Sequence, residues 1–249
     1  MYSTARISVI CAVWHGDPNR LELLRGHAAN LARQSVAVEP VYVFDGGDPI
    51  PSWVRGRAVS VRENLTIYQA WNVALSLVVT PGVMNLNLDD RLAPDAAEVL
   101  EREMLAAGAI AAGGDWKICY TQTETDDVEP CYPAERVPIV SGWPPVPGTL
   151  RRLGCGTHNF GSFGPVTLWQ VAAHLRAPRY PWRLRDGTLL RIVGDLAWWT
   201  ILTGDLRQKI VRVPMIIGNY HSHPKDQAEF RSLSYDEKKL LRDPGVSAL

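Results

Sequence analysis

The sequence predicts an α/β fold, with a mostly parallel central sheet flanked by helices in a single domain. Short apolar runs rich in β-branched residues alternate with segments whose apolar residues recur at helical spacing. Polar and acidic residues follow where several of these runs end. Apolar residues make up 46% of the 249 residues and charged residues 21%, an ordinary composition for a globular protein with one large core.

The first half of the chain has the clearest alternation. We expect four strands over short apolar runs, at residues 7–13, 41–44, 59–61 and 82–88. We expect helices over the segments with helical spacing, at residues 21–33, 67–79 and 94–107. A strand, helix, strand unit predicts a parallel pair, and ligands of such sheets bind at the carboxyl ends of the strands. The expected site therefore lies where these strands end.

The second half is less regular. Residues 121–164 are rich in Pro, Gly, Thr and single aromatics, which predicts loops or irregular strands packed on the domain. Helical spacing resumes in two segments, and a strand and a short terminal helix follow, at residues 168–175, 195–206, 210–217 and 235–242 respectively. We therefore expect one domain over residues 1–224 and a charged tail over residues 225–249.

Charge and cysteine content argue against several classes of protein. Lys plus Arg and Asp plus Glu number 26 each, so the formal net charge is zero and no global field favours nucleic acid or an anionic membrane. The four cysteines form no C-x-x-C pair, which signals neither a zinc site nor a disulfide framework. No apolar stretch approaches the roughly 20 residues that cross a bilayer. We expect a cytoplasmic protein without integral membrane association.

An acidic cluster follows the fourth expected strand, with the order Asn87, Leu88, Asp89, Asp90, Arg91. Carboxylate oxygens are the ligands that Mg²⁺ and Mn²⁺ prefer. A divalent cation bound to a diphosphate neutralises its charge and assists its departure as a leaving group. The alternative is an Asx turn or a helix cap that ends the strand.

In its register this cluster resembles inverting glycosyltransferase family 2, which has the GT-A fold with a Rossmann-like sheet. Family members commonly read Leu-Asp-x-Asp-Asp before a proline-started helix, and residues 86–95 fit that register. The resemblance implies that Asp89 is a metal ligand and that Mn²⁺ or Mg²⁺ is the cofactor. Asn87 stands where the family has its first acid.

Other segments carry the same resemblance. Trp14 follows the first strand, in the family's donor-binding loop, and Asp45 follows the second, where an acid contacts the base. Asn64 and Asn72 match the family's Glu-Asn-x-Gly segment and Ala-x-Asn helix. Turns and helix caps also use such residues. The nucleotide-sugar site that the resemblance implies comprises Val13, Trp14, His15, Asp45, Asn64, Asn72, Asn87 and Leu88.

A further acid, Asp195, precedes an aromatic-rich segment and matches the family's general base. Inversion at an anomeric carbon requires a base that takes the proton of the acceptor hydroxyl, and a carboxylate suffices. A helix N-cap is the alternative, and both roles are compatible. The family often has Arg shortly after the aromatics, where this chain has Thr200.

Two histidines follow the last expected strand. Several GT-A enzymes use a His in this neighbourhood as a metal ligand, so the resemblance adds His221 and His223 without choosing between them. It also implies acceptor contacts from aromatic residues, at Phe163, Trp182 and Trp198. Core packing is the alternative for such rings.

Taken together, the resemblance implies inverting transfer from a nucleoside-diphosphate sugar, with a UDP-sugar favoured, to an acceptor hydroxyl. Residues 1–92 would bind the donor and residues 93–224 the acceptor. Glycans, lipid-linked saccharides, small molecules, proteins and modified nucleobases remain open as acceptors, and so does a homodimer. Asn87 and Thr200 keep open the alternative of a non-catalytic nucleotide-sugar-binding protein. A nucleotidyltransferase would need a Gly-rich loop, and residues 13–19 contain only one glycine.

Overall fold

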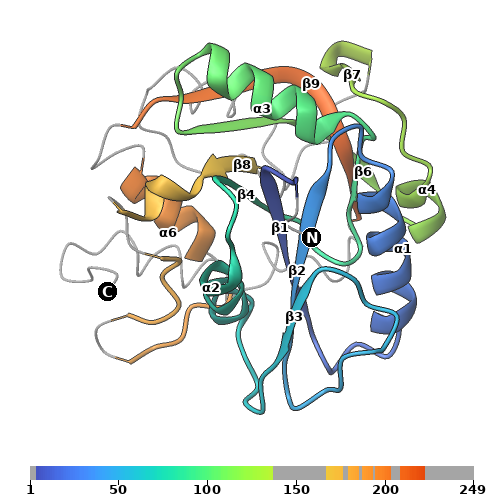
Figure 1. Cartoon of the computed structure of the whole chain (residues 1–249), viewed down its shortest axis with the longest axis vertical. Coiled ribbons are helices and arrows are strands. Elements are labelled where there is room, and N and C mark those ends of the chain that lie inside the picture. The colour runs from blue at the N-terminus through green and yellow to red at the C-terminus, as the bar shows by residue number, and fades with distance from the viewer. Residues whose placement is uncertain are drawn as a thin grey trace.

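The computed structural model describes residues 4–136, 167–175, 179–184, 187–192, 194–202 and 208–221. Its centre is a nine-stranded sheet in the order β3-β2-β1-β4-β8-β6-β9-β5, with β7 paired to β9 (Figure 1). The strands are β1 (Ile7–Val13), β2 (Val38–Phe44), β3 (Arg57–Ser60), β4 (Gly82–Asn85), β5 (Arg91–Leu92), β6 (Ala111–Cys119), β7 (Tyr132–Pro133), β8 (Thr167–Gln170) and β9 (Ile210–His221). The helices are α1 (Arg20–Ala32), α2 (Ile67–Leu77), α3 (Ala96–Ala106), α4 (Gln122–Asp126) and α6 (Gly194–Thr200), with 3₁₀ helices η1 (Ala134–Arg136) and η2 (Val171–Leu175).

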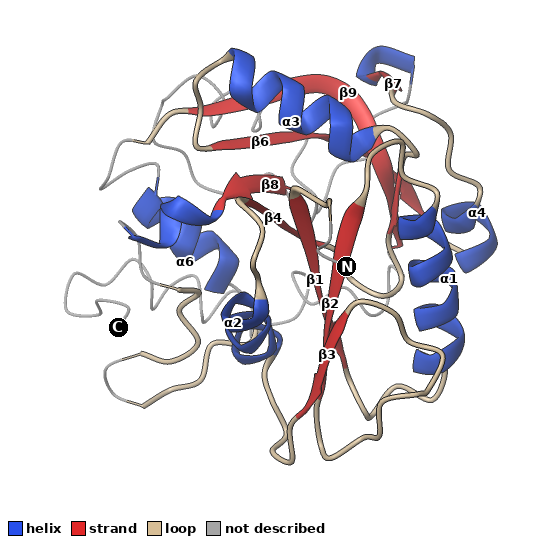
Figure 2. Cartoon of the chain, in the orientation of Figure 1, coloured by secondary structure: helices blue, strands red, loops and turns tan. Residues whose placement is uncertain are grey.

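The first four strands in sheet order, β3, β2, β1 and β4, are all parallel. Antiparallel β8 lies between β4 and β6, and β6 runs parallel to β9. Helices cover the sheet, and α1 and α4 lie on the same side of the molecule, near the end of β9 (Figure 2). These observations confirm the expected α/β fold with a mostly parallel sheet.

Alternate residues of β1 face different clusters of the core, as the two-residue period of a strand requires. Ile10 packs in one cluster with α2 and α6, whereas Val9 packs in another with α3. Cys11 and Val13 join a third cluster beside α1. With both faces covered, the strand ends are fixed rigidly enough to position side chains at the edge of the sheet.

Several expected elements differ in the structure. The helix expected at residues 168–175 is wrong, because β8 occupies its first part and η2 the rest. Leu168 and Trp169 are fully buried between β4 and β6, so pairing on both sides overrides their helical spacing. The fourth strand ends at Asn85, not at residue 88, because the chain turns through residues 87–90. Strand β6 and helix α4 have no expected counterpart.

Helix α2 begins where its sequence signal places it. The Thr66 hydroxyl accepts a hydrogen bond from the N–H of Gln69, and the Gln69 side chain caps the N–H of Thr66 in return. In the described part of the chain, no helix is long and apolar enough to span a bilayer. Phe163, His223 and the tail at residues 225–249 lie outside the described residues.

Candidate active site

The carboxyl ends of β1 and β2 lie side by side, because Val13 pairs with Phe44 in the parallel register. Trp14 and His15 follow β1, and Asp45 follows β2. Strand β4 pairs with the other side of β1, and its continuation brings Asn87 to the same edge of the sheet. The structure thus gathers the strand-end residues that the sequence singles out.

Asp45 joins the segments that follow β1 and β3. Its carboxylate accepts hydrogen bonds from the backbone N–H of His15 at 2.8 Å and of Leu65 at 3.1 Å. The His15 ring nitrogen Nδ1 lies 3.0 Å from the same carboxylate. The next residue, Gly46, donates its N–H to the Glu63 carbonyl. With only 3% of its surface exposed, Asp45 holds together the loops that follow β1 and β3 at this edge of the sheet.

Trp14 presents an aromatic surface beside this network. The side chain is 59% exposed, an unusual state for a tryptophan at the end of a buried strand. Its ring covers Gly16, where a Cβ atom would lie only 2.4 Å from the indole. The ring of His15 meets it edge-on, with 6.3 Å between centroids. Such an exposed indole is a surface on which a planar base can stack.

The turn after β4 carries two carboxylates of different exposure. Asp89 is half-buried, and Asp90 is buried and accepts a hydrogen bond from the backbone N–H of His221 at 3.0 Å. Burial raises the pKa of both, and the charge of Asp89 raises the pKa of Asp90 further. His221 and Arg91 lower the pKa of Asp89, and Asn87 lowers that of Asp90 through a side-chain hydrogen bond. Burial and mutual repulsion therefore disfavour the charged forms of these carboxylates, which a nearby cation would stabilise.

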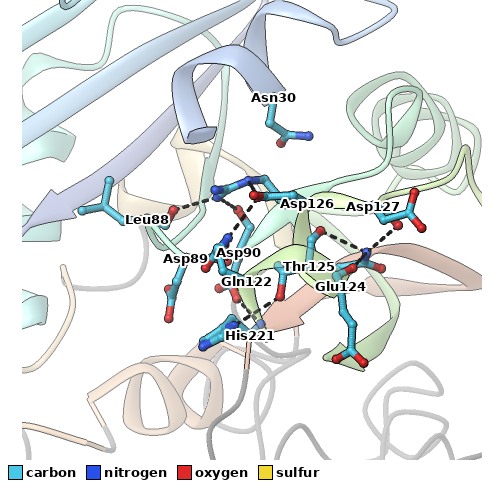
Figure 3. Close-up of polar contacts among 12 residues, drawn as sticks. Asn30, Leu88, Asp89, Asp90, Gln122, Glu124, Thr125, Asp126, Asp127 and His221 are labelled. Atoms are coloured by element: carbon cyan, nitrogen blue, oxygen red, sulfur yellow. Dashed lines mark hydrogen bonds and ion pairs between the residues drawn. The ribbon is translucent and has the colours of Figure 1, made fainter. Parts of the chain in front are cut away.

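Arg91 lies behind this turn, with only 2% of its side chain exposed. Its Nη1 donates to the carbonyls of Leu88 and Asp90, each at 2.7 Å, and its Nε forms an ion pair with Asp126 at 2.7 Å. Figure 3 shows these contacts around the turn, with the Asp89 carboxylate and the His221 ring on the same side. Arg91 thus braces the backbone on both sides of Asp89.

The residue types around Asp89 suit a divalent cation shared with a ligand. One carboxylate and one imidazole, from Asp89 and His221, match the donors that Mn²⁺ takes. The described residues contain no group of three or more His, Cys, Asp or Glu arranged to hold a metal by themselves. Mg²⁺ and similar ions complete such sites with phosphate oxygens and water. The residues present therefore fit a cation only where a ligand supplies further donors.

Asp195 lies in the first turn of α6, and the hydroxyl of Tyr68 donates to its carboxylate at 3.1 Å. Gly194 allows this approach, since a Cβ atom there would lie 2.3 Å from the Pro181 carbonyl and 2.6 Å from the Tyr68 ring. Burial and the Asp195 charge both raise the pKa of Tyr180, so this ring also lies near the acid. Helix α2 thus connects Asp195, through Tyr68, to the loop held by Asp45.

Three other expected site residues, Asn72, Trp198 and Trp182, contact other residues of the protein. The Asn72 amide accepts from and donates to the backbone of Tyr180, at 2.9 and 2.8 Å. Trp198 is 0% exposed and packs against Trp169 and Tyr180, so the structure places it in the core behind Asp195. Trp182 is half-buried, with the Arg183 guanidinium over its ring.

Among the remaining expected residues, Asn64 is exposed, whereas Val13 and Leu88 are buried in the core cluster beside α1. The structure also adds residues that the sequence pattern does not single out, namely Tyr68, Gln122, Thr125 and Asp126. Gln122, Thr125 and Asp126 lie in a polar run at residues 121–127, a weak signal that does not single out any of them. Their contacts depend on tertiary pairing.

Comparison with solved structures identifies the fold. S. aureus TarS 1–349 in complex with UDP aligns with a TM-score of 0.58 and 12% identity, over 95% of this chain and 64% of that one. The mannosyltransferase PcManGT from Pyrobaculum calidifontis, in complex with GDP-Man and Mn²⁺, aligns with a TM-score of 0.56 and 11% identity, over 97% and 64%. The fold is GT-A.

The likeness is one of fold, because the identity is so low. A longer TarS structure aligns over 95% of this chain but only 39% of its own length, so the chain spans less than two thirds of these proteins. No family model matches the sequence. No curated protein matches it either. The GT-A fold is thus confirmed, whereas membership of family 2 stays a prediction.

Proposed function

We propose that this chain is an inverting glycosyltransferase that moves a sugar from a nucleoside-diphosphate sugar to an acceptor hydroxyl. The observation that carries the proposal is the gathering of the Asp45 network, the exposed Trp14 and the Asp89 turn at one edge of a GT-A sheet. Solved proteins of this fold hold UDP, UDP-GlcNAc and GDP-Man. A UDP-sugar is the favoured donor.

The base and ribose would bind between Trp14 and the loop held by Asp45. The indole offers its face for stacking, and His15 beside it offers a polar ring edge. Asp45 keeps both loops in place because its carboxylate accepts their backbone N–H groups. Asn64, exposed in the loop after β3, extends this polar surface.

Asp89 and His221 would hold the cation, Mn²⁺ or Mg²⁺, that binds the diphosphate. When bound, such a cation neutralises charge that develops on the leaving diphosphate. The mannosyltransferase of the same fold contains Mn²⁺, which supports this assignment. His223 remains a proposed second candidate.

Asp195 would act as the general base. The acceptor oxygen attacks the anomeric carbon as the bond to the diphosphate breaks, and the hydroxyl proton passes to the Asp195 carboxylate. The hydrogen bond from Tyr68 orients this carboxylate. Trp182 and Phe163 are proposed to contact the acceptor, and buried Trp198 supports α6 from behind.

Turnover of a donor without acceptor tests this function. We expect slow release of UDP or GDP from UDP-GlcNAc, UDP-glucose or GDP-mannose in the presence of Mn²⁺, stopped by chelator and reduced in Asp195→Asn. Binding of a donor without any release of nucleotide would favour the non-catalytic alternative. Absence of binding to every donor would contradict the proposal.

A further inference from the structure

The short helix α4 joins the two sides of the candidate cation site. It has five residues, Gln122–Asp126, and no apolar face that would explain its position. A capping box stabilises its start, where the Thr121 hydroxyl accepts from the N–H of Glu124 and the Glu124 carboxylate accepts from the N–H of Thr121. What this helix contacts on each side indicates its role.

On one side, α4 holds the turn that carries Asp89. The Gln122 side chain donates to the carbonyl of Asp89 at 3.3 Å. Asp126 pairs with Arg91, whose guanidinium donates to the carbonyls of Leu88 and Asp90. The carbonyls of Leu88, Asp89 and Asp90 are therefore all linked to α4 (Figure 3). Gln122 binds the Asp89 carbonyl directly, and Asp126 is linked to the other two through Arg91.

On the other side, α4 holds the end of β9. The Thr125 hydroxyl donates to the Thr121 carbonyl at 2.9 Å, and its oxygen lies 3.3 Å from Nδ1 of His221. Because the hydroxyl has one hydrogen, already donated, its oxygen accepts from Nδ1–H. This tautomer leaves Nε2 of His221 with a lone pair for a cation. Thr125 therefore sets both the orientation and the tautomer of the ring.

Asn219 fastens the helix to β9. Its side-chain amide donates to the carbonyls of Glu124, Thr125 and Asp127, at 3.2, 3.1 and 3.2 Å. In the sheet, Asn219 pairs with Arg91 across the β5–β9 ladder. The Asp89 turn, α4 and the His221 strand thus form one hydrogen-bonded unit.

The negative charge of Asp126 has a second effect, because it balances the positive charge of Arg91. The Arg91 guanidinium is buried against Gly26, where a Cβ atom would lie 2.4 Å from Nη2, and it acts electrostatically on Asp89. A buried cation without a partner beside Asp89 would compete with a metal for that carboxylate. Asp126 balances this charge while it remains 51% exposed itself.

We propose that Asp126 and Thr125 are positioning residues of the cation site, Asp126 acting through Arg91 on Asp89 and Thr125 acting on His221. The proposal rests on the function proposed above. In this proposal both residues act through other side chains and not on the substrate itself. Helix α4 keeps the carboxylate and the imidazole at a fixed separation, so that one cation on a diphosphate meets both.

The test is UDP binding with Mn²⁺, measured by isothermal titration calorimetry on the full chain, with GDP as the second nucleotide. Asp126→Ala is compared with Asp127→Ala, which removes the same charge from the neighbouring exposed residue. We expect Asp126→Ala to weaken Mn²⁺-dependent affinity by about tenfold or more, the usual loss when a partner behind a metal ligand is removed. Asp127→Ala should match the wild type, and Asp126→Glu should recover most of the loss.

The outcomes separate this inference from the proposed function. If the wild type binds UDP or GDP only with Mn²⁺ and Asp126→Ala does so equally well, the positioning role is wrong while the function stands. If the wild type binds neither nucleotide with Mn²⁺, both are contradicted. An equal loss in Asp126→Ala and Asp127→Ala would also count against the specific role of Asp126.

Thr125 has its own matched pair. Thr125→Ser keeps the hydroxyl, whereas Thr125→Val keeps the shape and removes it. We expect weaker Mn²⁺-dependent UDP binding in the Val variant only, with the NMR signals of the His221 ring shifted to a different tautomer distribution. Identical ring signals and affinity in both variants would overturn the contribution of Thr125.

Discussion

The acids at the edge of the sheet belong to two regions that use them differently. In the β1–β2 region, the Asp45 carboxylate accepts hydrogen bonds from two loops, and the protein itself satisfies it. In the β4–β9 region, the Asp89 carboxylate has a backbone hydrogen bond within its own residue but no side-chain donor among the described residues, and Gln122 and Arg91 hold the backbone of its turn. Protein donors satisfy Asp45, whereas we propose that Asp89 is presented to a ligand.

The two acids at this edge of the sheet therefore have different expected roles, one structural and one in ligand binding. Asp45 should matter for the shape of the site and for stability, because its partners are protein atoms. Asp89 should matter for binding of a cation, because burial raises its pKa and a bound cation would stabilise its charged form. Asp195, bound by Tyr68 yet open to an acceptor in our proposal, combines both roles.

The largest effect is expected at Asp195. Asp195→Asn removes the proton acceptor but keeps a group that can accept from Tyr68, so turnover should fall by about two to four orders of magnitude. Donor affinity, measured by calorimetry, should stay near that of the wild type. Unchanged turnover would remove Asp195 from the mechanism.

A matched pair of substitutions tests the contrast itself. Asp45→Ala leaves the N–H groups of His15 and Leu65 without their acceptor, so the free energy of unfolding should fall by about 2 kcal/mol. Asp89→Ala removes the repulsion between Asp89 and Asp90, and the free energy of unfolding should change by less than about 0.5 kcal/mol. Urea denaturation measures both changes. Equal losses of unfolding free energy in the two variants would contradict the proposed difference between the two regions.

The buried His27 behind the Asp89 turn predicts a pH dependence of stability. Burial and the nearby Arg91 lower the pKa of His27 to about 3. Between that value and about 6.5, the unfolded chain binds a proton that the folded chain does not, so stability falls as the pH falls. From pH 7 to pH 5 the loss from this group should be about 2 kcal/mol.

The control for this effect is His27→Phe, which keeps a ring against Tyr42 and removes the titrating group. Its unfolding free energy should depend less steeply on pH over the same range than that of the wild type. Equal slopes for the two proteins would show that His27 does not carry the effect.

The smallest expected effect distinguishes the two histidines. His221→Ala should weaken Mn²⁺-dependent UDP binding by about tenfold or more, at least as much as loss of a partner behind a ligand, because the ring is one of two protein ligands in our proposal. His223→Ala should have a smaller effect. Equal and negligible effects would place both residues outside the site and leave Asp89 as the sole protein ligand.

The sequence predicts the N-terminal region well because its signals are local. Apolar runs define β1 and β2, and Asp45 and Trp14 follow them directly, so parallel pairing alone brings these residues together. The capping box of α2 is visible in Thr66 and Gln69. Such elements depend on neighbours in sequence rather than on distant partners.

The C-terminal region is harder to predict because its elements depend on tertiary pairing. Strand β6 begins with Ala111 and continues through Gly113 and Gly114, residues that strands seldom favour, and it forms because β8 and β9 flank it. Helix α4 is polar throughout, so no periodicity marks it. The bracing of Asp89 by Arg91 and Asp126 likewise requires the folded structure.

The central claim is that Asp89 presents its charge to a cation shared with a bound nucleotide. Calorimetric titration of UDP into the wild type and Asp89→Ala, with Mn²⁺ and with chelator, tests it most directly. We expect chelator to weaken wild-type binding by about tenfold or more, and Asp89→Ala to bind weakly whether or not Mn²⁺ is present. Wild-type affinity for UDP that is the same with Mn²⁺ and with chelator would contradict the claim.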